Sequence, residues 1–508
     1  MPTTPARETL HRCDRRAVMT LRCLFVDFNS YFASVEQYDD PALLGRPVAV
    51  VPVLSATTCA IAASYEAKAF GVKTGTPVWE ALELCPDLVL REARPARYIA
   101  MHHRLMAAIE ECIPHGKAES IDEVPCWLIG RERERSNAVA IAGRIKQRLV
   151  DEGFGPAIRC SIGIAPNRFL AKTASDMRKP DGLRVLEESD LPHALHALEL
   201  RDFCGIGPSV EQRLLRAGIR TSEQLCAASR SQLRAAWGSI EGERYWLQLR
   251  GHELPGRTER RASLGHSHVL GPELRSFEGA RAVLFKLLAK AAMRLRHERY
   301  LAGGLAIRMR FVGMDRRFER DLTFAPLDDT PTLLRLLGDE LSTLEAAAQR
   351  RRWNVKRHPP LSVAVTLMQL EPAGSITQEL MESRGRAKAI SATLDSINRR
   401  YGNNTLYFGA MQEALEQDAA PMRIPFAAIP EAGLEEDVGA RGKPAADTAE
   451  ELWLERERQF KVMAEEAHRK AREQPERVRA ATKPFGVGGW VRNPAAEPES
   501  PGTMGSLF

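Results

Sequence analysis

The sequence predicts an α+β fold of several domains, and three observations support this prediction. The chain has 508 residues, which is more than one domain core normally takes. Hydrophobic residues make up 44% and charged residues 27%, so the chain can bury real cores. Short apolar runs alternate with longer helical patterns, which indicates that strands and helices mix along the chain.

Composition also excludes several classes of protein. No apolar run approaches the roughly 18 residues that a membrane helix needs, and the N-terminus has no apolar signal core. We therefore expect no membrane partner. The nine cysteines are scattered and never form a C-x-x-C pair, which favours reduced thiols in the cytoplasm over zinc or disulfides.

Three acids are the most informative feature of the chain. Asp27 ends an apolar run, which predicts a buried strand with an acid at its exposed end. Asp122 and Glu123 are adjacent, and neighbours diverge on a strand, so both reach one site only at a strand end or bend. Three converging carboxylates need a cation between them, and hard oxygen ligands select Mg²⁺. Two such ions form the clamp used in nucleotidyl transfer.

Four stretches in order resemble the Y-family DNA polymerases, the translesion enzymes. They are Asp27–Glu36, Ala62–Gly75, Ser120–Glu123, and Ser161–Lys172 with its continuation through Asp176 to Lys179–Gly182. The resemblance covers roughly residues 22–410. It implies a right-hand polymerase with a palm, small fingers, a helical thumb with a helix-hairpin-helix, and a βαβ-type little finger.

The resemblance and the composition together divide the chain into segments. We expect a disordered leader at 1–20, the palm at 21–36 and 95–187, the fingers at 37–94, the thumb at 188–255, a linker at 256–262, the little finger at 263–372, an extension at 373–430 and a largely disordered tail at 431–508. Hydrophobic patterns predict palm helices at 98–113 and 136–152. In the little finger they predict helices at 277–298 and 331–348, and strands at 303–312 and 361–370.

The resemblance implies that the three acids are catalytic. Asp27, Asp122 and Glu123 would hold two Mg²⁺ ions, with the Phe28 carbonyl as a further oxygen ligand. One ion would lower the pKa of the primer 3′-hydroxyl, and the other would hold the β- and γ-phosphates. The chain departs from the family at Pro125, because proline removes a ladder donor and weakens the case for regular strand pairing beside Glu123.

The same resemblance implies the nucleotide contacts. Phe32 would be the steric gate, whose ring lies under the sugar and excludes a 2′-hydroxyl. Tyr31 would pack or make a backbone contact to the nucleotide. Tyr65, Lys68 and Lys172 match positions that touch the triphosphate, although many relatives have Arg where this chain has Lys68. Asn29 stands where many relatives have a second Asp.

Contacts to DNA are expected further along the chain. Gly205 and Gly207 lie in a segment resembling a helix-hairpin-helix, where glycines let the backbone approach a phosphate. Ser263, Gly265 and His266 open a segment resembling the first little-finger strand, which tracks the template. Arginines cluster in this segment and favour a phosphate-tracking surface: Arg294, Arg296, Arg299, Arg308, Arg310, Arg316, Arg317 and Arg320.

The last two residues, Leu507 and Phe508, resemble the end of bacterial clamp-binding peptides, which anchor two apolar side chains in the sliding clamp. Met504 replaces the Gln of those peptides. An arbitrary end of a disordered tail is the alternative. We therefore expect primer-template DNA and deoxynucleoside triphosphates as substrates, with the clamp and accessory mutagenesis proteins as partners.

The resemblance implies a DNA-directed DNA polymerase of the translesion type, with low fidelity, acting at the nucleoid in the cytoplasm. One alternative is an inactive polymerase-like adaptor that binds the clamp and partner proteins; the three retained acids argue against it. A second alternative is another two-metal palm enzyme, such as a nucleotide cyclase. That enzyme would not need a helix-hairpin-helix or a basic downstream domain.

Overall fold

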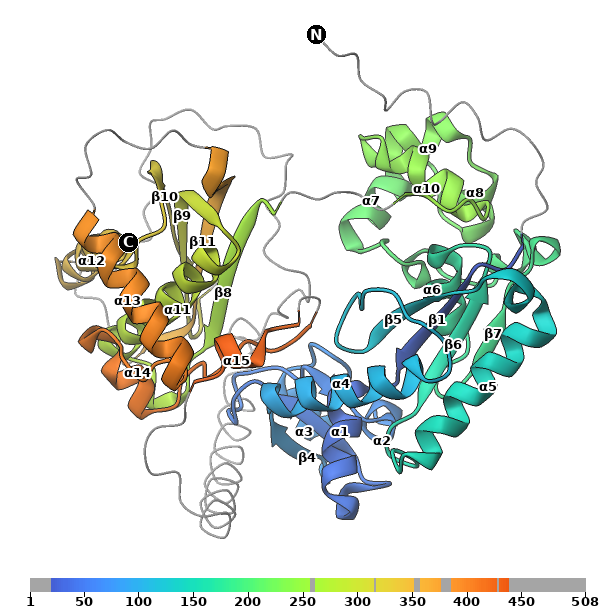
Figure 1. The fold of residues 1–508 in the computed structure, drawn as a ribbon, viewed down its shortest axis with the longest axis horizontal. Coiled ribbons are helices and arrows are strands. Elements are labelled where there is room, and N and C mark those ends of the chain that lie inside the picture. Colours follow the sequence, from blue (N-terminus) through green and yellow to red (C-terminus); the bar gives the residue numbers. More distant parts are fainter. Residues whose placement is uncertain are drawn as a thin grey trace. The chain divides into compact units, whose positions relative to one another are not determined.

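Figure 1 shows a computed structural model of the chain, which describes residues 20–255, 261–314, 317–350, 357–375, 385–426 and 429–437. The described part forms two compact units. The first runs to Tyr38 and resumes at Ala100, and the second takes Asp39–Ile99 with the described residues from 261 onward. Each unit mixes helices and sheets, which confirms the predicted α+β class. No described helix combines the length and apolar character that crossing a membrane requires.

A four-stranded sheet with the order β5-β1-β6-β7 organises the first unit. Its strands are β1 (Cys23–Phe28), β5 (Glu123–Trp127), β6 (Cys160–Ala165) and β7 (Leu183–Val185). Its helices are α1 (Tyr31–Asp39), α4 (Pro95–Glu110, which begins in the second unit), α5 (Arg135–Asp151) and α6 (Arg168–Asp176). Strand β1 is central and antiparallel to both neighbours, and every residue of it is buried.

Short helices complete the first unit, where the thumb was predicted. They are α7 (Pro208–Arg216), α8 (Ser222–Ala227), α9 (Arg230–Trp237) and α10 (Glu241–Leu249). Thr221 and Ser229 cap α8 and α9 by accepting hydrogen bonds from backbone amides of the first turn. The apolar sides of these helices share one core with Phe25 of β1 and Phe169 of α6.

The second unit contains a small three-stranded sheet where the fingers were predicted. Its order is β3-β2-β4, and its elements are β2 (Val48–Val51), β3 (Ala62–Ala63), α2 (Tyr65–Ala69), α3 (Val78–Leu84) and β4 (Val89–Glu92). Alanine and valine dominate its core, so little apolar surface is available to bury.

The larger sheet of the second unit has the order β10-β9-β11-β8, with every neighbouring pair antiparallel. Its elements are β8 (Ser263–Val269), α11 (Phe277–His297), β9 (Tyr300–Phe311), β10 (Arg317–Leu327), α12 (Thr330–Arg350) and β11 (Pro360–Pro372). Each helix therefore connects two strands that are not neighbours, which agrees with the two βαβ-like halves predicted here. Figure 1 shows α11 against one face of this sheet.

The extension after β11 packs on α11 instead of leaving the domain. It contains α13 (Gly385–Tyr401), α14 (Gln412–Glu416) and α15 (Ala432–Glu435). Lys286 and Lys290 of α11, with side chains 0% and 1% exposed, contact the Asp437 carboxylate at 2.7 and 2.8 Å. Their ammonium groups also donate to backbone carbonyls of the extension. Described residues 431–437 of the predicted tail are thus ordered by contacts with α11, while the rest of that tail lies outside the described residues.

Proline 125 does not interrupt the sheet. Strand β5 lies at the sheet edge and keeps its register with β1, pairing Pro125 with Phe25 and Glu123 with Asp27. The Pro125 carbonyl accepts a hydrogen bond from the Gly116 amide, on the side away from β1. A residue's nitrogen and carbonyl point to the same side of a strand, so the missing donor faces outward and costs β1 nothing.

Candidate active site

Strand geometry brings two of the predicted acids onto one face. Side chains alternate along β1, so Asp27 lies on the same face as Cys23 and Phe25, which pack against α6. Glu123 is directly opposite Asp27 in the β1–β5 ladder and therefore shares that face. Two like charges opposite each other repel, so this pairing requires a cation nearby.

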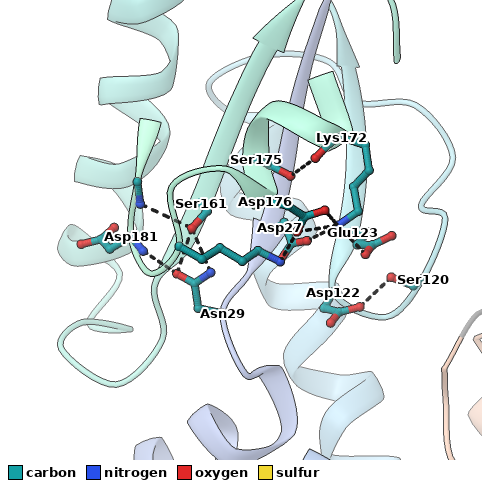
Figure 2. A network of polar contacts seen from close by, with 12 residues as sticks. Asp27, Asn29, Ser120, Asp122, Glu123, Ser161, Lys172, Ser175, Asp176 and Asp181 are labelled. Atoms are coloured by element: carbon teal, nitrogen blue, oxygen red, sulfur yellow. Dashed lines mark hydrogen bonds and ion pairs between the residues drawn. The ribbon is translucent and has the colours of Figure 1, made fainter. Parts of the chain in front are cut away.

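Two lysines supply that positive charge, and Figure 2 labels one of them, Lys172. The Lys172 ammonium lies 2.5 Å from Asp27, 2.9 Å from Glu123 and 3.2 Å from Asp176. The Lys179 ammonium lies 2.8 Å from Asp27 and 2.7 Å from Asp176. Burial lowers the pKa of each lysine, but the surrounding carboxylates outweigh burial and leave both pKa values raised. Both lysines are therefore cations in this cluster.

Asp122 lies just before β5 and turns away from Lys172. Its carboxylate accepts a hydrogen bond of 2.6 Å from the Ser120 hydroxyl, as Figure 2 shows. The Phe28 amide donates to the Asp122 carbonyl at 2.9 Å, which ties this residue to the end of β1. Burial raises the pKa of Asp122 to about 6, and repulsion from Asp27 and Glu123 adds to the effect. The residue thus lies within the electrostatic reach of the other two acids, at the strand end that the sequence required.

The donor chemistry fits a hard divalent cation. The cluster has four carboxylates, from Asp27, Asp122, Glu123 and Asp176, against two lysines, which leaves two negative charges. Carboxylate oxygens are the ligands that Mg²⁺ selects. Among the described residues, no three His, Cys, Asp or Glu side chains are gathered closely enough to ligate one ion. Lys172 lies between Asp27 and Glu123 in this arrangement, so binding an ion there requires its ammonium group to move.

Sequence reasoning missed two members of this cluster, Asp176 and Lys179. Both belong to a stretch that carried the resemblance, but neither was assigned a role. A signal was present, because Lys172 and Asp176 are four residues apart on a helix and so lie on one face. Lys179 carries no such signal, since its position depends on the loop between α6 and β7.

The predicted steric gate lies on α1, directly after the acid-bearing strand. Phe32 and Tyr31 are 4% and 3% exposed, and their ring centroids are 5.8 Å apart. Tyr31 also approaches Phe28, at 6.2 Å between centroids. A buried, packed ring keeps a fixed position, which a steric gate requires.

Tyr65 and Lys68 belong to α2 in the second unit. Ser64 caps this helix by accepting a hydrogen bond from the Ala67 amide. The Lys68 ammonium lies 4.3 Å from the centre of the Tyr65 ring, so both side chains share one face of the helix, as their spacing predicts.

Some of the residues predicted to contact DNA are exposed, and one has a buried side chain. Gly205 has φ +84°, a conformation that favours glycine, and Gly207 immediately precedes α7. In β8, Ser263 and Gly265 are exposed but His266 is only 5% exposed. Strand alternation turns the His266 ring inward and exposes Ser267, so a DNA contact at His266 stays a prediction for its backbone alone.

The arginine cluster is likewise only partly on the surface. Arg294 pairs with Glu435 and has a side chain 6% exposed, and Arg296 forms a two-pronged pair with Asp395. These two arginines connect α11 to the extension, so they are removed from the predicted phosphate-tracking surface. Arg299, Arg317 and Arg320 remain exposed, whereas Arg316 lies outside the described residues.

An acid-bearing mixed sheet, with a helical domain after it and a separate basic domain, defines the palm class of nucleotidyltransferases. Residues 26–176 match the impB/mucB/samB family, and residues 261–380 match the impB/mucB/samB family C-terminal domain. The chain therefore belongs to the impB/mucB/samB family, the Y-family of translesion polymerases, and is a DNA-directed DNA polymerase.

Individual relatives agree with this assignment. The chain is 33% identical to DNA polymerase IV of Moorella thermoacetica over 394 residues, covering 76% of this chain and 94% of that protein. It is 31% identical to DNA polymerase IV 1 of Bacillus subtilis strain 168, covering 76% and 92%. Among solved structures, the Y-family DNA polymerase chimera Dbh-Dpo4(243-245)-Dbh shares the fold with a TM-score of 0.56, at 23% identity over 69% of this chain and 99% of the chimera.

Proposed function

We propose that this polymerase extends primer 3′ ends with deoxynucleotides on damaged templates, at the acids of the first unit. The excess of carboxylates over lysines around Asp27 is the observation that carries the proposal. Asp27, Asp122 and Glu123 would hold two Mg²⁺ ions, with the Phe28 carbonyl as an additional ligand. When bound, the ions would neutralise phosphate charge and acidify the primer hydroxyl.

The chain's own residues would then bind and orient the nucleotide. Lys172 and Lys179 contact the acids in this structure, and their ammonium groups would bind the triphosphate when it lies beside those acids. Tyr65 and Lys68 present a second polar pair on one helix face. Positioning and charge contribute most of the rate in phosphoryl transfer, so this set of residues suffices without a covalent step.

Sugar selection would fall to Phe32. Its ring is packed against Tyr31 and buried, so it cannot yield to a 2′-hydroxyl without a cost in packing. Phe32→Ala removes the ring that would clash with the 2′-hydroxyl. It should therefore raise ribonucleotide incorporation relative to deoxynucleotide incorporation by at least about tenfold. The measurement is incorporation of each sugar opposite one template base. An unchanged ratio would assign Phe32 to packing alone.

Low fidelity is supported by the small size of the predicted fingers. Their three-stranded sheet has a core of alanine and valine and offers little surface for closing tightly over a base pair.

The proposed contacts to primer-template DNA are made by Gly205, Gly207, Ser263 and Gly265. The clamp contact at Leu507 and Phe508 lies outside the described residues, and it remains a proposal together with accessory mutagenesis proteins and action at the nucleoid.

Extension of a primed template, with and without an abasic site, tests the proposed function. The purified full chain with Mg²⁺ should extend both templates, and loaded clamp should increase extension. Arrest at the abasic site, with normal extension of the intact template, would refute the translesion role and leave the polymerase activity standing.

A further inference from the structure

We infer that Asn29 is a positioning residue, which fixes the loop of residues 178–182 and thereby places the Lys179 ammonium at Asp27. This inference rests on the proposed function, in which Lys179 binds the triphosphate. Asn29 lies two residues after Asp27 and is 4% exposed. Its side chain bonds to the Asp181 amide of the loop and to Ser161, and to neither the acids nor Lys179.

Both polar groups of the Asn29 side chain are used. Its Oδ1 accepts a hydrogen bond of 2.7 Å from the Asp181 amide, and its Nδ2 donates to the Ser161 hydroxyl at 3.0 Å. Figure 2 shows the side chain between these two partners. The Asp181 amide thus connects the end of β1 directly to the loop that carries Lys179.

The Asn29 backbone is equally fixed. Its amide donates to the Arg159 carbonyl at 2.9 Å, and its carbonyl accepts from the Ser34 hydroxyl at 2.7 Å. A side chain whose backbone is held on both sides has one orientation, so it can serve as a reference point for the loop. Asn29 is therefore held in place immediately after β1, two residues beyond Asp27.

The loop needs such an anchor because its backbone is unusual. Asp181 has φ +52°, a region that costs energy for a residue with a side chain. At Gly182, an added Cβ would lie 1.7 Å from the Arg178 carbonyl, so only glycine permits this close approach. Lys146 of α5 holds the other side, donating 2.6 Å hydrogen bonds to the Asp181 carbonyl and carboxylate.

The relevant contacts differ between candidate substitutions. Asn29→Asp keeps an acceptor for the Asp181 amide but loses the donor to Ser161. Asn29→Ala loses both and leaves the Asp181 amide without its partner. Ser161→Ala removes the Ser161 contacts to Asn29 and the 3.4 Å hydrogen bond from the Gly182 amide, but it leaves the Asp181 amide bonded to Asn29. Only Asn29→Ala removes the hydrogen-bond partner of the Asp181 amide, so this amide should respond strongly in Asn29→Ala and weakly in the other two variants.

Amide exchange in the free protein tests the anchor without relying on activity. We expect the Asp181 amide to exchange at least tenfold faster in Asn29→Ala than in the wild type, and within about threefold in Asn29→Asp and Ser161→Ala. Equal exchange in Asn29→Ala and the wild type would overturn the inference. A wild type that fails to extend primers would refute the proposed function. The exchange measurement would still test the anchor, because it does not depend on activity.

Kinetics with a double-mutant cycle test the consequence. Lys179→Met and Asn29→Ala should each lower kcat/KM for the nucleotide roughly tenfold, mainly through KM, and Asn29→Ala should add less than about twofold in the Lys179→Met background. Fully additive losses would show that Asn29 acts elsewhere and overturn the inference. If Asn29→Ala does not fold, Asn29→Asp decides: near-wild-type KM supports the inference, and a loss equal to that of Lys179→Met overturns it.

Discussion

Each unit of this polymerase contains a cluster of lysines and carboxylates, and the two clusters are built in opposite ways. The palm ion cluster is acid-rich: Asp27, Asp122, Glu123 and Asp176 surround Lys172 and Lys179. The little-finger ion cluster is cation-rich: Lys286, Lys290, Arg294 and Arg423 surround Glu435 and Asp437. Side chains of Glu123 and Asp176 are 26% and 33% exposed, whereas those of Glu435 and Asp437 are 4% and 5% exposed.

This difference separates a site from a structural element. An open cluster with excess negative charge can exchange its ammonium groups for divalent cations and phosphate. A closed cluster, whose ammonium groups also donate to the carbonyls of Ala419, Ala420 and Pro421, has no such freedom. It instead ties the extension to α11. Charge imbalance combined with exposure, and not the number of ion pairs, therefore marks the functional cluster.

The largest expected effect is a lower rate of primer extension when an acid of the palm ion cluster is removed. Asp122→Ala and Glu123→Ala should each slow single-turnover primer extension by about 10³-fold or more, since each would remove a proposed metal ligand. Fluorescence anisotropy should show primer-template binding within about threefold of the wild type, because the proposed contacts to DNA phosphates lie elsewhere. Near-wild-type extension by the Asp122 variant would contradict the site assignment.

The next effect is on stability, in the little-finger ion cluster. Lys286→Met leaves Asp437 with fewer cations in a closed setting, so the free energy of unfolding should fall by about 3–5 kcal/mol. Denaturant titration measures this loss. Lys388→Met, on the exposed face of α13, is the matched control and should change stability by less than about 0.5 kcal/mol. Equal effects of the two substitutions would show that the cluster is not structural.

The third effect is the pH dependence of stability that His266 causes beside the little-finger ion cluster. Burial lowers the pKa of His266 well below its ordinary value, and the positive charges of Lys290, Arg294 and Arg423 lower it further. The folded protein keeps this ring neutral while the unfolded chain protonates it near pH 6.5, so its contribution is complete above that pH and is lost as pH falls. Wild-type stability should therefore drop relative to His266→Gln below about pH 6.5, by at most ~1.4 kcal/mol per pH unit. Parallel pH profiles would contradict this.

Local patterns predicted most of the fold, because helices and strands follow apolar periodicity. The predicted helix at 277–298 is α11 at Phe277–His297, and the predicted strand at 361–370 is β11 at Pro360–Pro372. The apolar run before Asp27 predicted an acid at a strand end, and side-chain alternation predicted that Asp122 and Glu123 lie at a strand end or bend; in the structure β5 begins at Glu123. Lys179 was missed because a loop determines where it points.

The little-finger ion cluster was missed despite a signal in the sequence. Lys286, Lys290 and Arg294 are four residues apart, which places them on one face of an otherwise apolar helix. Basic residues were expected to face DNA, and Arg294 was assigned accordingly. Their partners Glu435 and Asp437 lie about 140 residues further on, in a segment expected to be disordered, so no local pattern could pair them.

The smallest expected effect compares the two clusters directly through Mg²⁺. In the wild type, Lys172 must leave Asp27 and Glu123 before an ion binds, so part of the binding free energy is lost to this displacement. Lys172→Met removes the competitor and leaves the carboxylates to repel one another. At a Mg²⁺ concentration about ten times the Kd of the variant, Mg²⁺ should stabilise the variant by about 1.4 kcal/mol. The same concentration should stabilise the wild type by less. Thermal unfolding with and without Mg²⁺ measures both shifts.

Lys286→Met, in the closed cluster, is the control and should show no greater Mg²⁺ shift than the wild type. Equal shifts in Lys172→Met and Lys286→Met would remove the distinction between an exchangeable and a fixed cluster.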